Sequence, residues 1–373
     1  MKILLYAHLM PDSEPVYMRE VGKEQESMKK KNSNNQLLMT LMKGRTFIVL
    51  IILLVFFSIV KNNFLSPTTL TMVAKHVALY GILALGMTFV IITGGIDLSV
   101  GSVVGLIGML AGGLIQEGLT LKFANVTLYF SVPMIVMFML VCGCIIGAVN
   151  GLIITKLNVA PFIATLGTMY VCRGFANLRS GGSTFSSIGG FEGLGNTGFK
   201  VLGSNLAGVP TGVYIFAILA IISFVLLKKT SFGWYVLAVG GNEKSARLSG
   251  IKTDKIKILV YMISGFCAAW VGMINTAQLS AAHPASGDGW EMNAIAATVL
   301  GGTSMAGGSG TILGTVVGAF VIGVINDGMT MCGVSEFWQK VIRGCVIILA
   351  VVIDQTQRNM EAKMALQARN ENK

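Results

Sequence analysis

The sequence predicts an all-α polytopic membrane protein with about ten transmembrane helices, some of them broken at glycines. Only 12% of the 373 residues are charged and 53% are hydrophobic, whereas soluble domains average about 25% charged residues. Several charge-free runs reach or approach the roughly 20 apolar residues that a helical span needs. These runs lack the two-residue alternation of membrane β-barrels, so helices are favoured.

The distribution of Lys and Arg orients the predicted spans. Residues 1–45 hold eight basic residues and the segment 228–257 holds seven, and short loops rich in Lys and Arg stay in the cytoplasm. We therefore expect both termini inside, a cytoplasmic and partly disordered segment 1–45, a membrane domain 46–354 with a cytoplasmic loop at about 229–256, and a cytoplasmic tail 355–373. The expected spans lie near 46–61, 73–94, 98–116, 128–151, 159–177, 211–228, 257–279, 291–304, 310–327 and 337–354.

The second and third spans form one apolar run that turns back at "ITGGIDLSVGS", residues 92–102. Gly94 and Gly95 weaken a helix and permit backbone angles that other residues resist. Asp97, the only charge between Val77 and Gln116, or Ser99 can then cap the following helix. The alternative is a functional carboxylate on a transport path or in a moving joint, since ionisable groups within membranes are costly.

The fourth and fifth spans combine small residues with uncharged polar ones. Glycines four apart, as in "GAVNG", allow helix backbones to approach closely, so they favour packing over a pore. Polar side chains in or near these and later spans either contact a polar solute or tie helices together. The candidates are Asn150, Thr165, Asn275, Gln278 and Asn293.

The loop before the seventh span contains "NEKSARLSG", which favours a short surface helix. Ala246 and Gly250 are four apart, so we expect them to share a helical face. Two interpretations stay open. The loop is either a solvated connector or a docking helix whose face of small residues fits a groove in a partner.

The eighth and ninth spans are separated by a second glycine-dense break, "LGGTSMAGGSGTILGT", which opens with Gly301 and Gly302. Interrupted apolar segments at matched places suggest an internal duplication, with a transport pathway between the halves.

The sequence offers no catalytic residues, no metal site and no basis for binding nucleic acid. No G-x-x-x-x-G-K-[ST] motif occurs, so the chain lacks a P-loop for ATP. Its three histidines are far apart, and five of its six cysteines lie in apolar runs, as small buried side chains do. We predict a protein that is not an enzyme.

Four segments resemble the permease subunits of bacterial ABC importers for ribose, galactose, xylose and related monosaccharides. They are "ITGGIDLSVGS", "NGLIITKLNVAPFIATLGTM", "GGNEKSARLSGI" and "EMNAIAATVLGGTSMAGGSGTILGTVVGA", in that order. The similarity runs from about residue 46 to 354. The chain departs from the family pattern at Lys244, where other ABC importers carry an acid, and at "GGSTFSS", residues 181–187, where relatives often show "GGRPI".

This resemblance implies an inner-membrane location and several partners. They are membrane lipid, a second permease copy or a sibling permease, ABC ATPase subunits inside, and a periplasmic or lipid-anchored sugar-binding protein outside. It implies no cofactor in this chain, with ATP and Mg bound by the ATPase. It also implies a coupling helix formed by Glu243, Ala246, Arg247 and Gly250.

Three other functions stay open at this point. One is an ion-coupled secondary transporter of a small polar solute, with Asp97 as the coupling carboxylate. Another is an ABC permease for autoinducer-2 or another polyol. The third is a membrane scaffold that transports nothing, against which the paired glycine breaks argue weakly.

Overall fold

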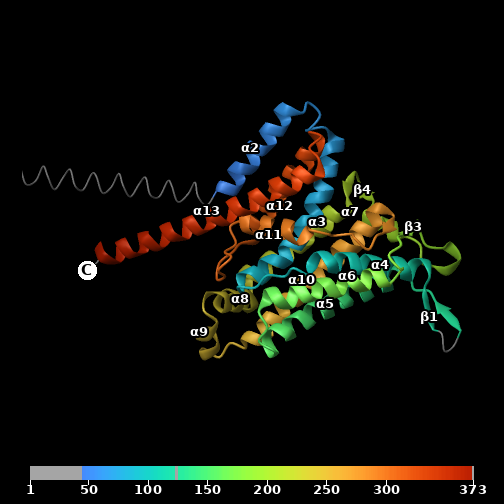
Figure 1. Ribbon diagram of the computed structural model, residues 1–373, viewed down its shortest axis with the longest axis horizontal. Helices are drawn as coiled ribbons and strands as arrows, with labels where there is room; N and C mark the ends of the chain where they lie inside the picture. The colour runs from blue at the N-terminus through green and yellow to red at the C-terminus, as the bar shows by residue number, and fades with distance from the viewer. Residues whose placement is uncertain (1–43, 122–124, 372–373) are drawn as a thin grey trace, which may run out of the picture. The chain divides into compact units, whose positions relative to one another are not determined.

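The computed structural model describes residues 44–121 and 125–371 (Figure 1). The chain divides into two units, Met1–Arg45 and Thr46–Lys373. The prediction for segment 1–45 therefore lies almost entirely outside the described residues.

Helices make up most of the described chain. Their bounds are α2 Arg45–Val60, α3 Pro67–Ile92, α4 Val100–Gln116, α5 Val132–Lys156, α6 Pro161–Leu178, α7 Thr211–Lys229, α8 Ser231–Gly241, α9 Glu243–Leu248, α10 Thr253–Leu279, α11 Trp290–Leu300, α12 Ile312–Met331 and α13 Glu336–Glu371. Two short 3-10 helices, η1 Glu192–Leu194 and η2 Phe199–Gly203, lie between α6 and α7.

The described fold is not purely α-helical, because short strands pair in three antiparallel ladders. The strands are β1 Leu119–Leu121, β2 Val126–Leu128, β3 Phe185–Ser186, β4 Asn205–Leu206, β5 Val209–Pro210 and β6 Ala281–Ala282. β1 pairs with β2, and β4 with β5. β3 pairs with β6 in the register Phe185 to Ala282, which ties the loop after α6 to the loop after α10.

The predicted spans agree only in part with the helices observed. In the described chain, α3, α5, α7, α10 and α12 are long and apolar enough to cross a membrane, and Thr46–Val60 and Val100–Gln116 are shorter apolar helices. α11 has 11 residues, which at 1.5 Å per residue gives about 17 Å, too short for a hydrocarbon core of about 30 Å. The span expected at 291–304 is therefore helical for only part of its length.

The predicted boundary between the last span and the tail is not a helix end. α13 runs without interruption from Glu336 to Glu371. After Gly344 its sequence contains no Gly or Pro, and residues 355–371 are rich in Ala, Gln, Arg, Glu and Met, which are good helix formers.

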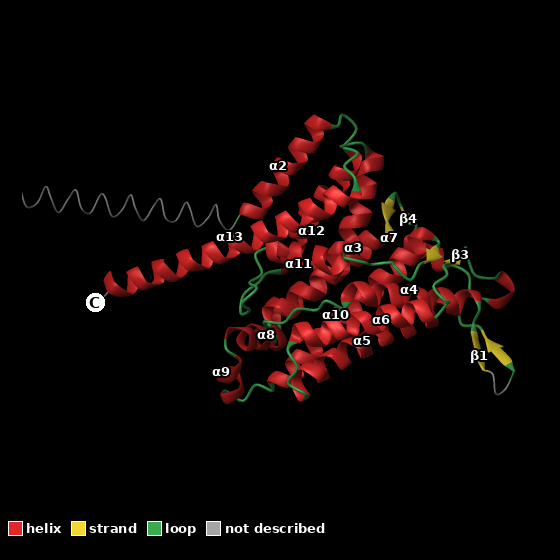
Figure 2. Ribbon diagram, in the orientation of Figure 1, coloured by secondary structure: helices red, strands yellow, loops and turns green. Residues whose placement is uncertain are grey.

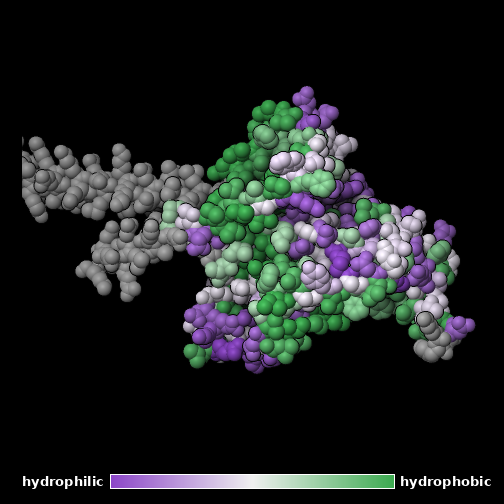
Figure 3. All heavy atoms as spheres, in the orientation of Figure 1, coloured by the Kyte–Doolittle hydropathy of each residue, from purple (hydrophilic) through white to green (hydrophobic). Residues whose placement is uncertain are grey.

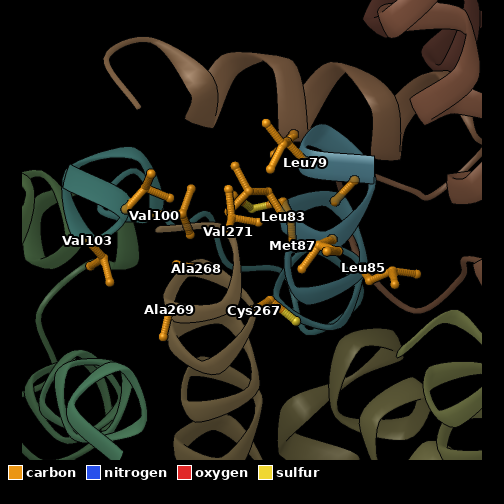
Figure 4. Close-up of a cluster of buried hydrophobic side chains, with 14 of the residues drawn as sticks. Leu79, Leu83, Leu85, Met87, Val100, Val103, Cys267, Ala268, Ala269 and Val271 are labelled. Atoms are coloured by element: carbon orange, nitrogen blue, oxygen red, sulfur yellow. The ribbon is translucent and has the colours of Figure 1, made fainter. Parts of the chain in front are cut away.

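α10 lies at the centre of the helix packing. Figure 4 shows its residues Cys267–Val271 between α4, which supplies Val100, and α3, which supplies Leu83. Ala268 is fully buried and Leu83 is 1% exposed. Because the residues on this side of α10 are small, both neighbouring helices come close to it.

α5 packs against another side of α10 through glycines four residues apart. A Cβ atom on Gly143 would overlap the carbonyl oxygen of Gly265, and one on Gly151 would lie 2.6 Å from the Cα of Ile258. Gly147 has the same relation to the backbone of Tyr261. The expected role of these small residues in helix packing is confirmed.

The loops gather at two opposite ends of the bundle (Figure 2). The strands and 3-10 helices lie at one end, here called the strand end, and α8 and α9 lie at the other, here called the α9 end. Figure 3 shows hydrophilic residues over α9 and hydrophobic residues over α2 and α5. Apolar side chains such as Ile59, 76% exposed, face outward from these helices, as expected of a protein whose solvent is lipid.

Candidate functional site

The two glycine breaks lie against each other at the α9 end. The first separates α3, ending at Ile92, from α4, and the second separates α11 from α12. Gly94 has φ +77° and Gly302 has φ +86°, the left-handed region that glycine adopts without steric strain. The backbone N–H of Gly308 donates to the carbonyl oxygen of Ile92 at 2.9 Å, so the second break supplies a partner for the open end of α3.

A third segment reaches the same point through Gly240, the penultimate residue of α8. A Cβ atom on Gly240 would overlap the carbonyl oxygen of Ile92 and would lie 2.6 Å from the backbone nitrogen of Gly308. One on Gly307 would lie 3.2 Å from the nitrogen of Gly94. We call this backbone contact of Ile92, Gly94, Gly240, Gly307 and Gly308 the glycine joint.

The predicted break residues have different places around this joint. Gly94 lies in it, whereas Gly95 faces Tyr261, whose hydroxyl would lie 2.5 Å from an added Cβ atom. Gly301 packs on the backbone of Gly314, and Gly302 has no neighbour within 4 Å of an added Cβ atom. The sequence analysis did not select three residues of the joint, Gly240, Gly307 and Gly308. The doublets Gly240–Gly241 and Gly307–Gly308 were the available signal.

Asp97 is buried, with 1% exposure, and accepts three hydrogen bonds. Its Oδ1 accepts from the backbone N–H of Ser99 at 3.0 Å and from the Ser99 hydroxyl at 2.6 Å. Its Oδ2 accepts from the hydroxyl of Ser264 on α10 at 2.7 Å. The carboxylate therefore fixes the start of α4 and ties it to α10.

Of the two residues expected to cap α4, Asp97 or Ser99, Ser99 does not do so with its side chain. Ser99 occupies the N-cap position, but its side chain makes no capping bond and its backbone is already helical, with φ −78° and ψ −17°. The Ser99 hydroxyl instead donates to the Asp97 carboxylate, and its oxygen accepts from Asn150 on α5 rather than from a backbone N–H of α4. Asp97 satisfies a backbone N–H at this end of α4, in agreement with the capping alternative.

Two of the five polar path candidates join this network. Asn150 on α5 donates from Nδ2 to the Ser99 hydroxyl at 3.0 Å and accepts from Thr168 at 2.6 Å. Thr165 on α6 donates to the carbonyl oxygen of Ile96 at 3.2 Å. These contacts tie α5 and α6 to the first break, and sequence reasoning missed Thr168.

The other three path candidates do not reach Asp97. Asn275 and Gln278 lie near the C-terminal end of α10, and Asn293 lies in the first turn of α11, all toward the strand end. Gln278 Nε2 and Asn293 Nδ2 are buried without a hydrogen-bond partner among the described residues. The polar path residues therefore form two separated groups.

The short helix expected before the seventh span is α9, but the predicted shared face of Ala246 and Gly250 is wrong. Ala246 is 5% exposed and packs against the rest of this chain. Gly250 lies beyond the helix end with φ +86°. The N–H of Ile251 bonds the carbonyl of Ala246 and the N–H of Gly250 bonds that of Arg247, a Schellman end that favours glycine.

Glu243 and Arg247 hold α9 to its own chain. Glu243 pairs with Lys257 at 2.6 Å, and Arg247 pairs with Asp254 at 3.0 Å, which Lys156 also reaches at 2.8 Å. Such exposed pairs are individually worth about 0–1 kcal/mol, but a network fixes geometry. A cleft of about 240 Å³ lies between this network and the α5–α6 connection.

The outward face of α9 carries a residue that sequence reasoning did not select. Leu248 is 91% exposed, and Lys244, one turn earlier, is also exposed. An apolar side chain this exposed at a polar end of the molecule suggests a contact with another protein. The missed signal is a leucine inside the otherwise polar stretch "NEKSARLSG".

Comparison with known proteins gives a consistent result. Residues 69–351 match the family described as branched-chain amino acid transport system / permease component. The ribose import permease protein of Bacillus subtilis (strain 168) is 42% identical over 299 residues, 80% of this chain and 88% of the relative. The galactose/methyl galactoside import permease protein of Haemophilus influenzae is 39% identical, over 73% of this chain and 82% of the relative. The xylose transport system permease protein of the same organism is 32% identical, over 79% of this chain and 91% of the relative. No solved structure matches.

Proposed function

Because the chain belongs to the family of permease components of branched-chain amino acid transport systems, we propose that it is the permease subunit of an ABC importer that carries a monosaccharide, ribose or a closely related sugar. The observation that carries this proposal is the similarity to ribose, galactose and xylose permeases over most of their length. The chain is a transport subunit rather than an enzyme, and it is a multi-pass protein of the inner membrane.

The proposal includes the arrangement of the partners. The α9 end faces the cytoplasm and an ABC ATPase, because it contains the basic segment 228–257. The strand end faces the sugar-binding protein. ATP and Mg are bound by the ATPase, and the permease pairs with a second copy or a sibling chain.

The glycine joint supports a route from the ATPase to the membrane helices. α9 follows α8 after a single residue, Asn242. A displacement of α9 by the bound ATPase therefore also moves the end of α8. Gly240 contacts the end of α3 and the second break directly through backbone. Since no side chain intervenes, this movement shifts α3 and α12 as rigid elements.

The function is tested by uptake in vesicles that contain the permease, its ATPase and its binding protein. We expect uptake of D-ribose, D-xylose or D-galactose that requires ATP hydrolysis and persists when proton and sodium gradients are dissipated. Uptake that is independent of ATP and depends on an ion gradient would instead establish a secondary transporter.

Replacing Leu248 with aspartate is expected to weaken the complex of permease and ATPase by about tenfold or more, because truncating a buried apolar anchor at an interface typically costs about 1–4 kcal/mol. The measurement is retention of the ATPase on purified permease over a concentration series. Leu206→Asp is the matched control, since Leu206 is 60% exposed at the strand end. Equal retention by the two variants would show that Leu248 does not contact the ATPase.

A further inference from the structure

A group of polar and aromatic side chains, in which Asn326 and Asp327 are buried and His76, Tyr80 and Trp290 are partly exposed, lies near the strand end, away from the glycine joint and the Asp97 network. His76 on α3 and Asp327 on α12 form a pair, Nδ1 to Oδ1, at 2.6 Å, and Asp327 is 4% exposed. One turn from His76, the ring of Tyr80 packs edge-on against Trp290, with centroids 5.5 Å apart. Three helices, α3, α11 and α12, thus meet around one small region.

Three polar atoms in this region have no hydrogen-bond partner among the described residues. They are Nδ2 and Oδ1 of Asn326 and Oδ2 of Asp327, and Asn326 is 8% exposed. The Tyr80 hydroxyl lies beside Asn326 without the geometry of a hydrogen bond. Buried groups left unpaired are costly and rare in folded proteins, so these atoms call for a partner from outside the chain.

The unpaired atoms fit a partner that carries several neighbouring hydroxyl groups. Asn326 offers a donor and an acceptor side by side, and Asp327 adds a second acceptor. Neighbouring hydroxyl groups each donate and accept, so a polyhydroxylated molecule satisfies all three atoms. The Tyr80 and Trp290 rings offer apolar surface for the carbon–hydrogen face of such a molecule.

The charges favour a neutral ligand over an ion. Asp327 is already paired with His76, and Arg343 on α13 lies within electrostatic reach of Tyr80 together with Asp327. A bound cation would compete with the histidine, and a bound anion would face the carboxylate. A neutral sugar meets neither difficulty.

We propose that His76, Tyr80, Trp290, Asn326 and Asp327 form a contact site for the monosaccharide at the strand end of the permease, an inference that rests on the proposed function. The three free atoms are covered in the present conformation. The site therefore takes up sugar when α3 and α12 separate at this end, and the His76–Asp327 pair closes it again. At this site the sugar exchanges part of its hydrogen bonds to water for hydrogen bonds to these atoms before it passes between the helices.

The test replaces Asn326 with leucine in the complete complex of permease, ATPase and binding protein, reconstituted in proteoliposomes. D-ribose, D-xylose and D-galactose are supplied separately and as competing pairs. We expect uptake to fall roughly tenfold, the effect of losing one hydrogen-bonded contact to a polar ligand, while the ATPase rate is kept. We also expect the preference among the three sugars to change, which a purely structural residue would not alter.

Thr330→Val is the matched control, one turn further along α12. The Thr330 hydroxyl already donates to the carbonyl oxygen of Asn326 at 2.9 Å, so it is not free to bind a sugar. Asn326→Gln keeps the amide but moves it, and provides a second variant in which the sugar preference is measured should the leucine variant fail to assemble.

Two results separate failure of this site from failure of the function. If the unmodified complex imports the sugars but both Asn326 variants keep its uptake and its preference, the contact site is refuted alone. If the unmodified complex imports none of the three sugars, the proposed function is refuted and the site with it.

Discussion

Replacing Asp97 with alanine is expected to lower the stability of the permease by roughly 2–5 kcal/mol, since three buried donors lose their acceptor and each unsatisfied group costs about 1–3 kcal/mol. The donors are the N–H and hydroxyl of Ser99 and the hydroxyl of Ser264. The hydroxyls can turn toward other acceptors, but the backbone N–H cannot, so the start of α4 is the first point to loosen. The measurements are the amount of folded permease in the membrane and its thermal unfolding midpoint after purification.

Comparing Asp97→Ala with Asp97→Asn separates the structural role of the Asp97 hydrogen bonds from a role of its charge. Asparagine keeps an oxygen for Ser99, and the Ser264 hydroxyl can turn to accept from the new amide, so we expect a cost of only about 1 kcal/mol and substantial uptake. Asp288→Ala is the control, because Asp288 is exposed and surface substitutions usually change stability by about 0.5 kcal/mol or less. A folded Asp97→Asn complex without uptake would show that the charge itself acts, as an ion-coupled transporter requires.

Gly240→Ala is expected to uncouple ATP hydrolysis from transport. The added methyl group would overlap the carbonyl oxygen of Ile92, and a backbone atom cannot turn away as a side chain does. Overpacking of this kind costs about 1–3 kcal/mol, so α8 must separate from the end of α3 and lose its direct contact. We expect uptake per assembled complex to fall by about tenfold. The ATPase rate is expected to persist because the exposed face of α9 is unchanged.

Gly241→Ala provides a closely matched control for this substitution. Gly241 is the next residue along α8, yet an added Cβ atom there would have no neighbour within 4 Å. Uptake and ATPase activity are measured on the same preparations, after size-exclusion chromatography has confirmed the assembled complex. Equal uptake by the two alanine variants would refute the glycine joint as the route of coupling.

The sequence by itself determined the class of the protein and the approximate places of its helices. A content of 12% charged residues and long apolar runs exclude a surface that is solvated by water throughout. This conclusion depends only on the composition and the order of the residues. The glycine pairs at Gly94 and Gly301 follow the ends of α3 and α11, and the conformational freedom of glycine is a property of the residue itself. Spacing of four between glycines in α5 likewise predicted close packing, since the helical repeat is fixed.

Only the tertiary structure decided which of these features meet. Sequence periodicity placed Ala246 and Gly250 on one face, but Gly250 ends the helix in a left-handed conformation and Ala246 faces the chain. In the sequence Gly240 is one half of a glycine doublet with no visible partner, and its importance comes from Ile92, which is 148 positions away and which it contacts through backbone. Asp97 was visible as a lone charge, whereas its partner Ser264 lies 167 positions away. Contacts between distant segments depend on how whole helices pack, and that packing is a sum over many side chains rather than a property of any local pattern.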